Sequence, residues 1–218
     1  SIVMRRTKII CTIGPATSET DMLAKLIEAG MDVARLNFSH GNHDIHRQTV
    51  ANIREASNIT GRPVAIMQDL QGPKIRTGML ENGAVTLEEG ARFVITTDDI
   101  EYGNAERVGT SYKELANEVS EGSEILLDDG YLILRAEKVE GNDIITTVEK
   151  GGVLKDRKGI ITPGSSISAP AMSEKDIDDL KLGLEIGIDA VALSFVKSEK
   201  DILELRTTMK LFGRMVPI

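Results

Sequence analysis

Several residue classes are scarce in this chain of 218 residues. Tryptophan is absent and aromatic residues make up 3 % of the sequence, so nucleic-acid binding by base stacking is not expected. A single cysteine, Cys11, cannot build an internal disulfide framework, which favours a reducing, cytoplasmic location. Its place in an apolar run indicates a buried, inert thiol. No apolar run approaches the roughly 18 residues of a membrane span, and the opening residues, SIVMRRTK, lack the apolar region of a signal peptide.

Basic residues are also scarce relative to acidic ones, with 26 Lys and Arg against 34 Asp and Glu. The formal net charge is −8, which argues against a nucleic-acid-binding surface because such surfaces are basic. A small basic site for a phosphorylated metabolite remains compatible with this composition, since local charge and net charge are separate quantities. Hydrophobic residues make up 41 % of the chain, enough for a sizeable core in one large domain or two small ones.

The first third of the chain alternates between strand and helix patterns. Strands are predicted at 7–13, 32–38 and 63–68, and the first of these is apolar enough to be buried on both faces. One helix is predicted between Ser18, as its cap, and Gly30, and a second runs from about 44 to 58. Strand, helix, strand, helix, strand is the pattern of βα units in a parallel sheet.

The pattern changes in the middle of the chain and then returns. Residues 84–168 hold short β runs separated by turns such as Asn-Gly and Asp-Gly, with one short helical turn near 111–119, which predicts a small antiparallel barrel or sandwich. A helix capped by Ser173 follows, then a strand at 189–196, a helix opened by Ser198, and the start of a fifth strand at 216–218.

Five parallel strands with an inserted β domain favour an α/β fold of the (β/α)₈, or TIM, barrel type that is only partly present. Residues 1–71 and 171–218 would form the barrel portion, and 72–170 the insert after the third strand. A doubly wound sheet is the alternative. In a barrel, the chemistry lies at the C-terminal ends of the strands.

Polar residues alternate along the second predicted strand. Arg35, Asn37 and Ser39 share one face of it. Three polar groups on a buried strand need either partners in a hydrogen-bonded network or a ligand, and both interpretations remain open. The planar guanidinium of Arg35 suits a phosphate because it donates two hydrogen bonds at once.

Other charged residues have ordinary interpretations. Asp69 precedes a Gly-Pro turn, and turn capping is the commoner role of such an aspartate. Lys74 and Arg76 alternate, as in a solvated charge pair on an edge strand, and Lys158 lies at a predicted surface turn.

Metal sites are weakly indicated. His43 and His46 are three residues apart with no third ligand nearby in the sequence, so a solvated helix face is favoured over a metal site. Asp128 and Asp129 before Gly130 are typical of a turn. Two adjacent acids could bind Mg²⁺, but their side chains diverge in an extended strand, so they indicate such a site only weakly. The sequence contains neither a Walker loop nor a nucleophile elbow.

A series of motifs resembles one enzyme family. KIICTIGPAT, MDVARLNFSHG, DLQGPKIRTG, LLDDG, KGIITPG, SISAPAMSEKDIDDL and DAVALSFV follow one another in the order and near the spacing of pyruvate kinases. The resemblance covers essentially the whole chain. It implies a glycolytic phosphotransferase, homotetrameric at full length, that converts phosphoenolpyruvate and ADP into pyruvate and ATP, with the β insert as a lid over the nucleotide.

The resemblance also implies residue roles. Arg35 would contact the transferring phosphoryl group as the catalytic residue. The positions that match substrate or nucleotide contacts are Arg35, His40, Arg76, Lys158, Ser194 and Phe195. The pocket for a monovalent cation matches Asn37, Ser39 and Asp69, with the backbone carbonyl of Leu70.

Two cofactor expectations follow from the same resemblance. Leu70-Gln71 with Lys74 resembles the family branch that works without potassium, so Lys74 is expected to take the place of K⁺. The family's Mg²⁺ ligands, in a Lys-Ile-Glu motif and a later aspartate, are expected beyond Ile218 together with the catalytic lysine. These 218 residues are therefore expected to be an inactive fragment of the enzyme.

Two other functions remain as alternatives. One is a barrel lyase or aldolase that handles pyruvate enolates, and the other is a non-catalytic binding module. The β insert and Lys158 favour the kinase over the lyase or aldolase, and both alternatives rank below the kinase.

Overall fold

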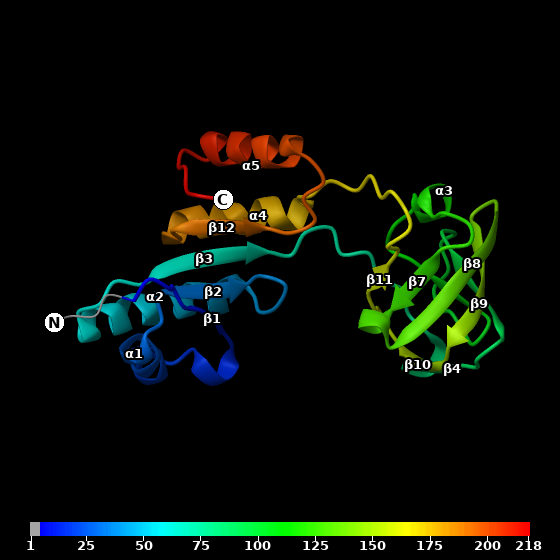
Figure 1. The fold of residues 1–218 in the computed structure, drawn as a ribbon, viewed down its shortest axis with the longest axis horizontal. Coiled ribbons are helices and arrows are strands. Elements are labelled where there is room, and N and C mark those ends of the chain that lie inside the picture. The colour runs from blue at the N-terminus through cyan, green and yellow to red at the C-terminus, as the bar shows by residue number, and fades with distance from the viewer. Residues whose placement is uncertain (1–4) are drawn as a thin grey trace. The chain divides into compact units, whose positions relative to one another are not determined.

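The computed structural model describes residues 5–218, so residues 1–4 of the predicted barrel portion lie outside the described part. Two compact units form: one comprises the chain up to Pro73 together with Pro170–Ile218, and the other comprises Lys74–Ala169 (Figure 1). No helix of the described residues combines the length and the apolarity needed to cross a membrane.

The first unit is built on a parallel sheet of four strands. Its order is β1 (Ile10–Ile13), β2 (Val33–Asn37), β3 (Ala65–Leu70) and β12 (Ala190–Leu193). The connecting helices are α1 (Thr20–Ala29), α2 (His43–Thr60), α4 (Glu174–Ile186) and α5 (Glu199–Leu211). The α/β class and the parallel pairing predicted from the βα pattern are thus confirmed, with strands that are mostly shorter than expected.

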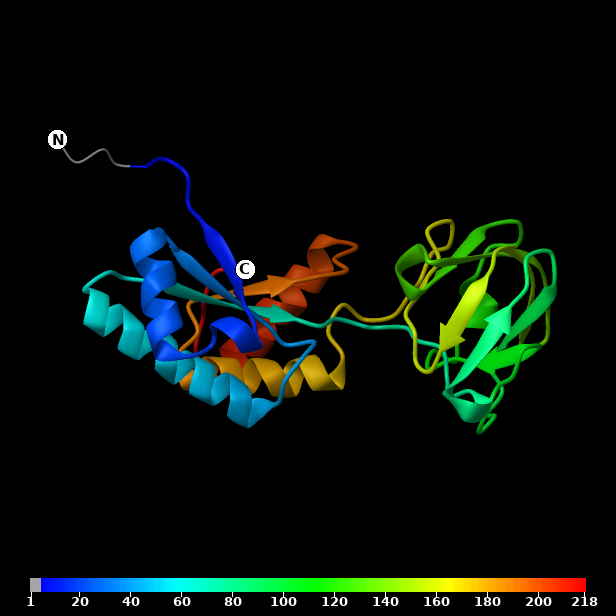
Figure 2. The ribbon, with the colours of Figure 1, turned by 90° about the horizontal axis from the view of Figure 1, so that it is seen from below.

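Alternation along the strands decides which side chains face the helices. Leu36 on β2 and Ile66 on β3 are fully buried in one apolar core with Ile53 of α2 and Leu180 of α4. Figure 2 shows helices α2 and α4 on the same side of the sheet. The side chains that alternate with the buried ones, such as Arg35, point to the opposite face of the sheet. The sequence alternation therefore separates an apolar face under the helices from a face with polar groups.

The contact between β3 and α4 depends on a glycine. Gln68 of β3 is fully buried, and its Nε2 donates to the backbone oxygen of Asp179 at 2.7 Å. A Cβ atom on Gly183 would lie 2.2 Å from the amide oxygen of Gln68. The absence of a side chain at position 183 thus lets helix α4 approach the sheet this closely.

Helix caps follow the sequence pattern in one case and not in another. Ser173 Oγ accepts a hydrogen bond from Asp176 N, and the Asp176 carboxylate accepts one from Ser173 N, as the capping-box pattern predicts. Ser18 does not cap α1: its hydroxyl donates to Pro15 O, and Glu19 is the N-cap. The 3-10 turn η1 (Pro15–Thr17) lies directly before Ser18. Because its Pro15 carbonyl accepts the hydrogen bond of the Ser18 hydroxyl, that hydroxyl does not cap α1.

The outer strands of the sheet correct two expectations. β1 is an edge strand, with Ile10 55 % exposed and Cys11 half-buried, so it is not buried on both faces. Residues 216–218 form no strand. Their backbone nevertheless runs beside β12, because Val191 N donates to Pro217 O at 2.9 Å.

The second unit is a β structure. Its main sheet has the order β11 (Ile160–Ile161), β7 (Glu124–Leu127), β8 (Leu132–Glu140), β9 (Asp143–Lys150), β5 (Arg92–Thr96) and β6 (Arg107–Gly109), and β4 (Ala84–Leu87) pairs with β10 (Gly152–Lys155). The short elements are α3 (Leu115–Glu118), η2 (Glu81–Gly83) and η3 (Asp128–Gly130). All pairs of strands are antiparallel except β5 with β6. The core of this unit is separate and includes the fully buried Phe93.

Candidate functional site

An ion pair crosses the polar face of the first sheet. Arg35 donates from Nε to Asp69 Oδ2 at 2.7 Å, and its Nη2 lies 2.5 Å from the same oxygen. Nη1 donates to Thr12 Oγ1 at 3.0 Å. The alignment of Thr12 with Arg35 across β1 and β2 makes the second contact possible. Asp69 is therefore a partner of Arg35, and the turn-capping interpretation was wrong. These contacts use three of the five guanidinium N–H groups, which leaves two for a ligand.

The loop after β2 adds polar groups beside this pair. Asn37 is aligned with Asp69 across β2 and β3, and Asn37 Oδ1 accepts a hydrogen bond from Ser39 N at 3.0 Å. The backbone of Phe38 donates to Asp69 O at 3.0 Å. The side chain of Leu70 is buried under the helices, so only its backbone could contribute to a site on this face. The structure thus brings Asn37, Ser39 and Asp69 together.

The end of β12 lies at the same edge of the sheet. Ala192 of β12 is aligned with Asp69, and Ser194 and Phe195 follow as exposed residues. Phe195 has a φ of +60°, and its ring packs so closely on Gly72 that a Cβ there would lie 2.7 Å from Cδ2. A positive φ is costly for a bulky residue and often marks a functional position.

Three cations predicted as site residues belong to the second unit. Arg76 is bridged to Gly159, and Thr77 N donates to Lys158 O at 2.7 Å, so Arg76 and Lys158 lie on adjacent backbone segments. Lys158 Nζ lies 3.8 Å from Asp128 Oδ1. Lys74 is exposed, and its Cε would lie 4.0 Å from a Cβ on Gly159. Instead of an edge strand, isolated bridges hold this segment.

The turn that carries Asp128 has an unusual backbone. Asp128, Asp129 and Gly130 have φ values of +51°, +56° and +87°. The turn predicted there is confirmed, but two consecutive aspartates in the left-handed region go beyond an ordinary turn preference. Such conformations cost free energy and gather at functional sites, and here the turn places a carboxylate beside Lys158.

A cavity of ≈ 270 Å³ lies next to Arg76 in the second unit. Arg157 and Lys113 also line it, together with Asp98 and Asp99. The hydrogen bond from Lys113 holds the pKa of Asp99 below its usual value. Sequence analysis did not find Arg157 or Lys113 as site residues. The position of Arg157 directly before Lys158 was the only available indication.

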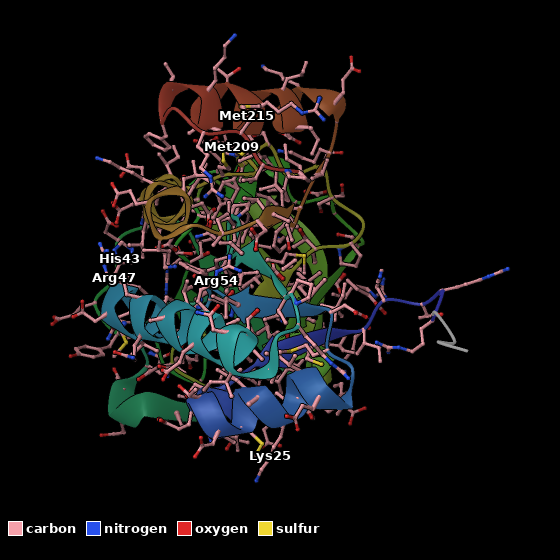
Figure 3. The ribbon with its side chains drawn as sticks, turned by 90° about the vertical axis from the view of Figure 1, so that its left-hand side faces the viewer. Lys25, His43, Arg47, Arg54, Met209 and Met215 are labelled. Carbon is pink, nitrogen blue, oxygen red and sulfur yellow. The ribbon has the colours of Figure 1, made fainter. Side chains whose placement is uncertain are left out.

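The two histidines of helix α2 differ from the prediction. His46 is 8 % exposed rather than solvated: its ring stacks on Phe38 with 3.9 Å between centroids, and Nε2 lies 2.8 Å from His40 O. Burial lowers the pKa of His46. His43, at the start of the same helix (Figure 3), contacts Asp179 at 2.9 Å.

The surroundings of His43 also correct the expectation that no third ligand is nearby. Asp178 and Asp179, from helix α4, bring their carboxylates to within 4.8 Å of its ring nitrogen and of each other. Asp179 is already paired with Lys175 at 2.6 Å. The cluster is therefore an ion-pair network in the described structure.

Comparisons with known proteins point to one family. The family model "Pyruvate kinase, barrel domain" matches residues 4–218. Over 214 residues the chain is 49 % identical to a pyruvate kinase of Mycobacterium tuberculosis strain H37Rv. The matched region covers 98 % of this chain and 45 % of that protein. A pyruvate kinase of Geobacillus stearothermophilus is 48 % identical over 208 residues, or 94 % and 35 % of the two chains.

A solved structure is similar as well. The crystal structure of a pyruvate kinase from Cryptosporidium parvum matches with a TM-score of 0.90 and 40 % identity, over 94 % of this chain and 42 % of that one. The chain thus spans less than half the length of these relatives.

Proposed function

Because the chain belongs to the pyruvate kinase barrel-domain family, we propose that it forms part of an enzyme that transfers a phosphoryl group from phosphoenolpyruvate to ADP, giving pyruvate and ATP. The first unit would contribute the first four strands of a (β/α)₈ barrel, and residues 72–170 an inserted β domain that closes over the nucleotide. A cytoplasmic, homotetrameric full-length enzyme of glycolysis is part of the same proposal.

The observation that carries the proposal is the fixed guanidinium of Arg35. Phosphoryl transfer requires little covalent chemistry from the protein and depends on positioning and neutralising the phosphoryl oxygens. Asp69 and Thr12 hold the guanidinium in one orientation through three N–H groups, and the remaining N–H groups can bind an anion. Arg35 would therefore contact the transferring phosphoryl group.

The remaining predicted residues take supporting roles in the proposal. Ser194 and Phe195 would border the substrate at the end of β12, and His40, Arg76 and Lys158 would bind the nucleotide phosphates. Closure of the β domain would exclude water, which otherwise competes with ADP as the acceptor.

The cation requirement can be proposed more specifically. Asn37, Ser39, Asp69 and the carbonyl of Leu70 match a monovalent-cation pocket, and Lys74 follows Asp69 by five positions in the chain. We propose that the ammonium of Lys74 supplies the positive charge that K⁺ supplies in other members. A tethered charge needs no capture of an ion from solution.

The four strands of the first sheet do not supply a complete set of Mg²⁺ ligands. Among the residues of the four strands of the first sheet, Asp69 is the only carboxylate, and Arg35 engages it. Mg²⁺ is usually held by one or two free carboxylates together with substrate phosphates. The residues present do not fit that site, and the proposed role of Arg35 does not depend on it.

The deciding experiment is a coupled assay of the full-length protein with phosphoenolpyruvate and ADP. Pyruvate formation that requires ADP supports the kinase. Cleavage of a carbon–carbon bond without ADP would indicate a lyase, and binding of phosphoenolpyruvate without turnover would indicate a binding module. In a parallel sample we expect the isolated 218 residues to show no measurable turnover, because the residues present do not complete a Mg²⁺ site.

A further inference from the structure

Two backbone carbonyls in the loop between β2 and α2 are each held by a side chain from a helix. Lys175 Nζ, from helix α4, donates to Phe38 O at 2.8 Å. His46 Nε2, from helix α2, lies 2.8 Å from His40 O. A carbonyl only accepts hydrogen bonds, so Nε2 of His46 must be the donor. Ser39 lies between the two carbonyls that these side chains hold.

Lys175 is anchored at its other side. Its ammonium lies 2.6 Å from Asp179 Oδ2, one helical turn farther along α4. The Asp179 side chain is 5 % exposed, and its second oxygen contacts His43 at 2.9 Å. The backbone oxygen of Asp179 accepts from the buried Gln68. Lys175 is therefore fixed to the packed interface between helix α4 and the sheet, although half of its side chain is exposed.

The Phe38–Ser39 peptide group is held at both ends. Its carbonyl oxygen accepts from Lys175, and its N–H, which belongs to Ser39, donates to Asn37 Oδ1 at 3.0 Å. A peptide group is planar, so two opposed hydrogen bonds fix its orientation. That orientation sets the direction in which the chain leaves Ser39.

His46 restrains the next part of the loop by packing as well as by its hydrogen bond. Its ring stacks on Phe38 with an interplanar angle of 10°. A Cβ on Gly41, whose φ is +79°, would lie 3.2 Å from His46 Nε2. The loop therefore fits closely around the imidazole, and any displacement of the ring would move His40 and Gly41 with it.

We propose that Lys175 and His46 are positioning residues that fix Ser39 and His40, in the loop that Phe38 ties to Asp69, without touching substrate. The inference rests on the proposed function, because Ser39 and His40 are site residues only in that proposal. Loss of the Lys175 hydrogen bond would free the Phe38–Ser39 peptide to rotate. Misplacement of catalytic groups by about 1 Å can lower a rate by roughly 100-fold, so we expect a loss of about 10- to 100-fold in kcat/KM.

The test compares Lys175→Met with Lys181→Met in the full-length protein. Lys181 is exposed on the same helix. Its replacement by methionine is the same chemical change, but it leaves the hydrogen bond of Lys175 to the loop intact. The readouts are kcat and KM for phosphoenolpyruvate, the thermal midpoint, and amide hydrogen exchange at residues 38–41. We expect Lys175→Met to raise exchange of Ser39 and His40 about tenfold or more and to lower kcat/KM. The thermal midpoint should fall as well, because the buried carboxylate of Asp179 loses its ion pair. Lys175→Arg should restore much of the exchange protection and of kcat/KM, because a guanidinium can donate to Phe38 O and Asp179 together.

A second variant keeps the test decisive if Lys175→Met does not fold. His46→Phe preserves the ring over Phe38 but removes the donor to His40 O. It should raise amide exchange at His40, whose N–H donates to Asn37 O, and lower kcat/KM. Unchanged exchange and kinetics in both variants would overturn the inference. So would an equal loss in Lys181→Met. Because hydrogen exchange is measured without catalysis, a wild-type protein lacking kinase activity would refute the proposed function while the restraint on the loop is still tested.

Discussion

The carboxylate of Asp69 lies against the guanidinium of Arg35 on the neighbouring strand, and one oxygen, Oδ2, accepts from both Nε and Nη2. The two side chains are 15 % and 29 % exposed. Partly buried ion pairs contribute little net stability because desolvation offsets the attraction between the charges. The pair is better explained by the orientation that it gives to Arg35 than by its effect on the free energy of unfolding.

Replacing Arg35 with lysine should therefore impair catalysis more than folding. Lysine keeps the charge but cannot donate from a planar fork to Asp69, Thr12 and a phosphoryl group together. We expect Arg35→Lys to lower kcat/KM of the full-length enzyme by at least about 100-fold, with a thermal midpoint near that of the wild type. Arg47→Lys, at an exposed position of helix α2 (Figure 3), is the matched control. Near wild-type kinetics for Arg35→Lys would contradict the role of the guanidinium.

The local elements were predictable because local rules determine them. Alternation in 32–38 predicted both the strand and the face that carries Arg35, and a Ser173 to Asp176 capping box predicted the start of α4. The parallel sheet followed from the order of strands and helices. Failures at this level came from competing local partners: Ser18 bonded to the preceding turn instead of capping the helix.

The partners of the site residues were not predictable, because they come from distant positions. Arg35 and Asp69 are 34 residues apart, and only the register of β2 on β3 shows that they meet. The sequence predicted that His46 lies on a solvated helix face, yet its ring is buried by packing on Phe38. Lys175 reaches the same loop from 137 residues away. Residues that lie so far apart in the chain leave no local sequence pattern from which their contact could be predicted.

Replacing Lys74 with glutamate should create a dependence on potassium. If the ammonium supplies the charge that K⁺ supplies elsewhere, the full-length enzyme should be active in buffers that contain only a bulky organic cation. Lys74→Glu should lose most activity in such a buffer and recover on addition of KCl, because an anionic pocket then requires an ion. Steady-state rates against KCl concentration, at constant ionic strength, measure this effect.

Lys155→Glu provides the charge control for that experiment. Lys155 is exposed on β10 of the same unit. Its replacement by glutamate changes the net charge by the same two units, but at a position outside the proposed pocket. We expect its rate to be independent of KCl. Strong activation of the wild type by KCl would refute the substitution of K⁺ by Lys74, as would indifference of Lys74→Glu to the salt.

Gly183 and Gln68 should show a strong energetic coupling. In Gly183→Ala, the new Cβ would lie 2.2 Å from the buried Gln68 amide oxygen. Overpacking of this kind costs about 1–3 kcal/mol, more than the gain of up to about 1 kcal/mol from replacing glycine in a helix. We expect the thermal midpoint to fall by several degrees. In the Gln68→Ala background the same substitution should be neutral or stabilising, whereas additive effects would show that the two residues do not meet.

The burial of His46 predicts that stability falls under mildly acidic conditions. Burial is the main cause of the lowered pKa of His46, and Lys175 and His43 lower it further against the opposing effects of the His40 hydrogen bond and Asp179. Its stabilising contribution is complete above the unfolded pKa of 6.5. Below that pH the unfolded chain binds the proton first, so the free energy of unfolding decreases by at most about 1.4 kcal/mol per pH unit.

Thermal midpoints of the wild type and of His46→Phe between about pH 5 and 8 test this linkage. The variant lacks the proton-binding group, so its midpoint should decline less below pH 6.5. His40→Gln keeps His46 and the backbone carbonyl to which it donates, so the decline caused by His46 should remain. A wild-type slope in His46→Phe would mean that His46 does not stay neutral in the folded protein. Its bond to the His40 carbonyl, which needs only the Nε2 proton, would then exist in the charged form as well.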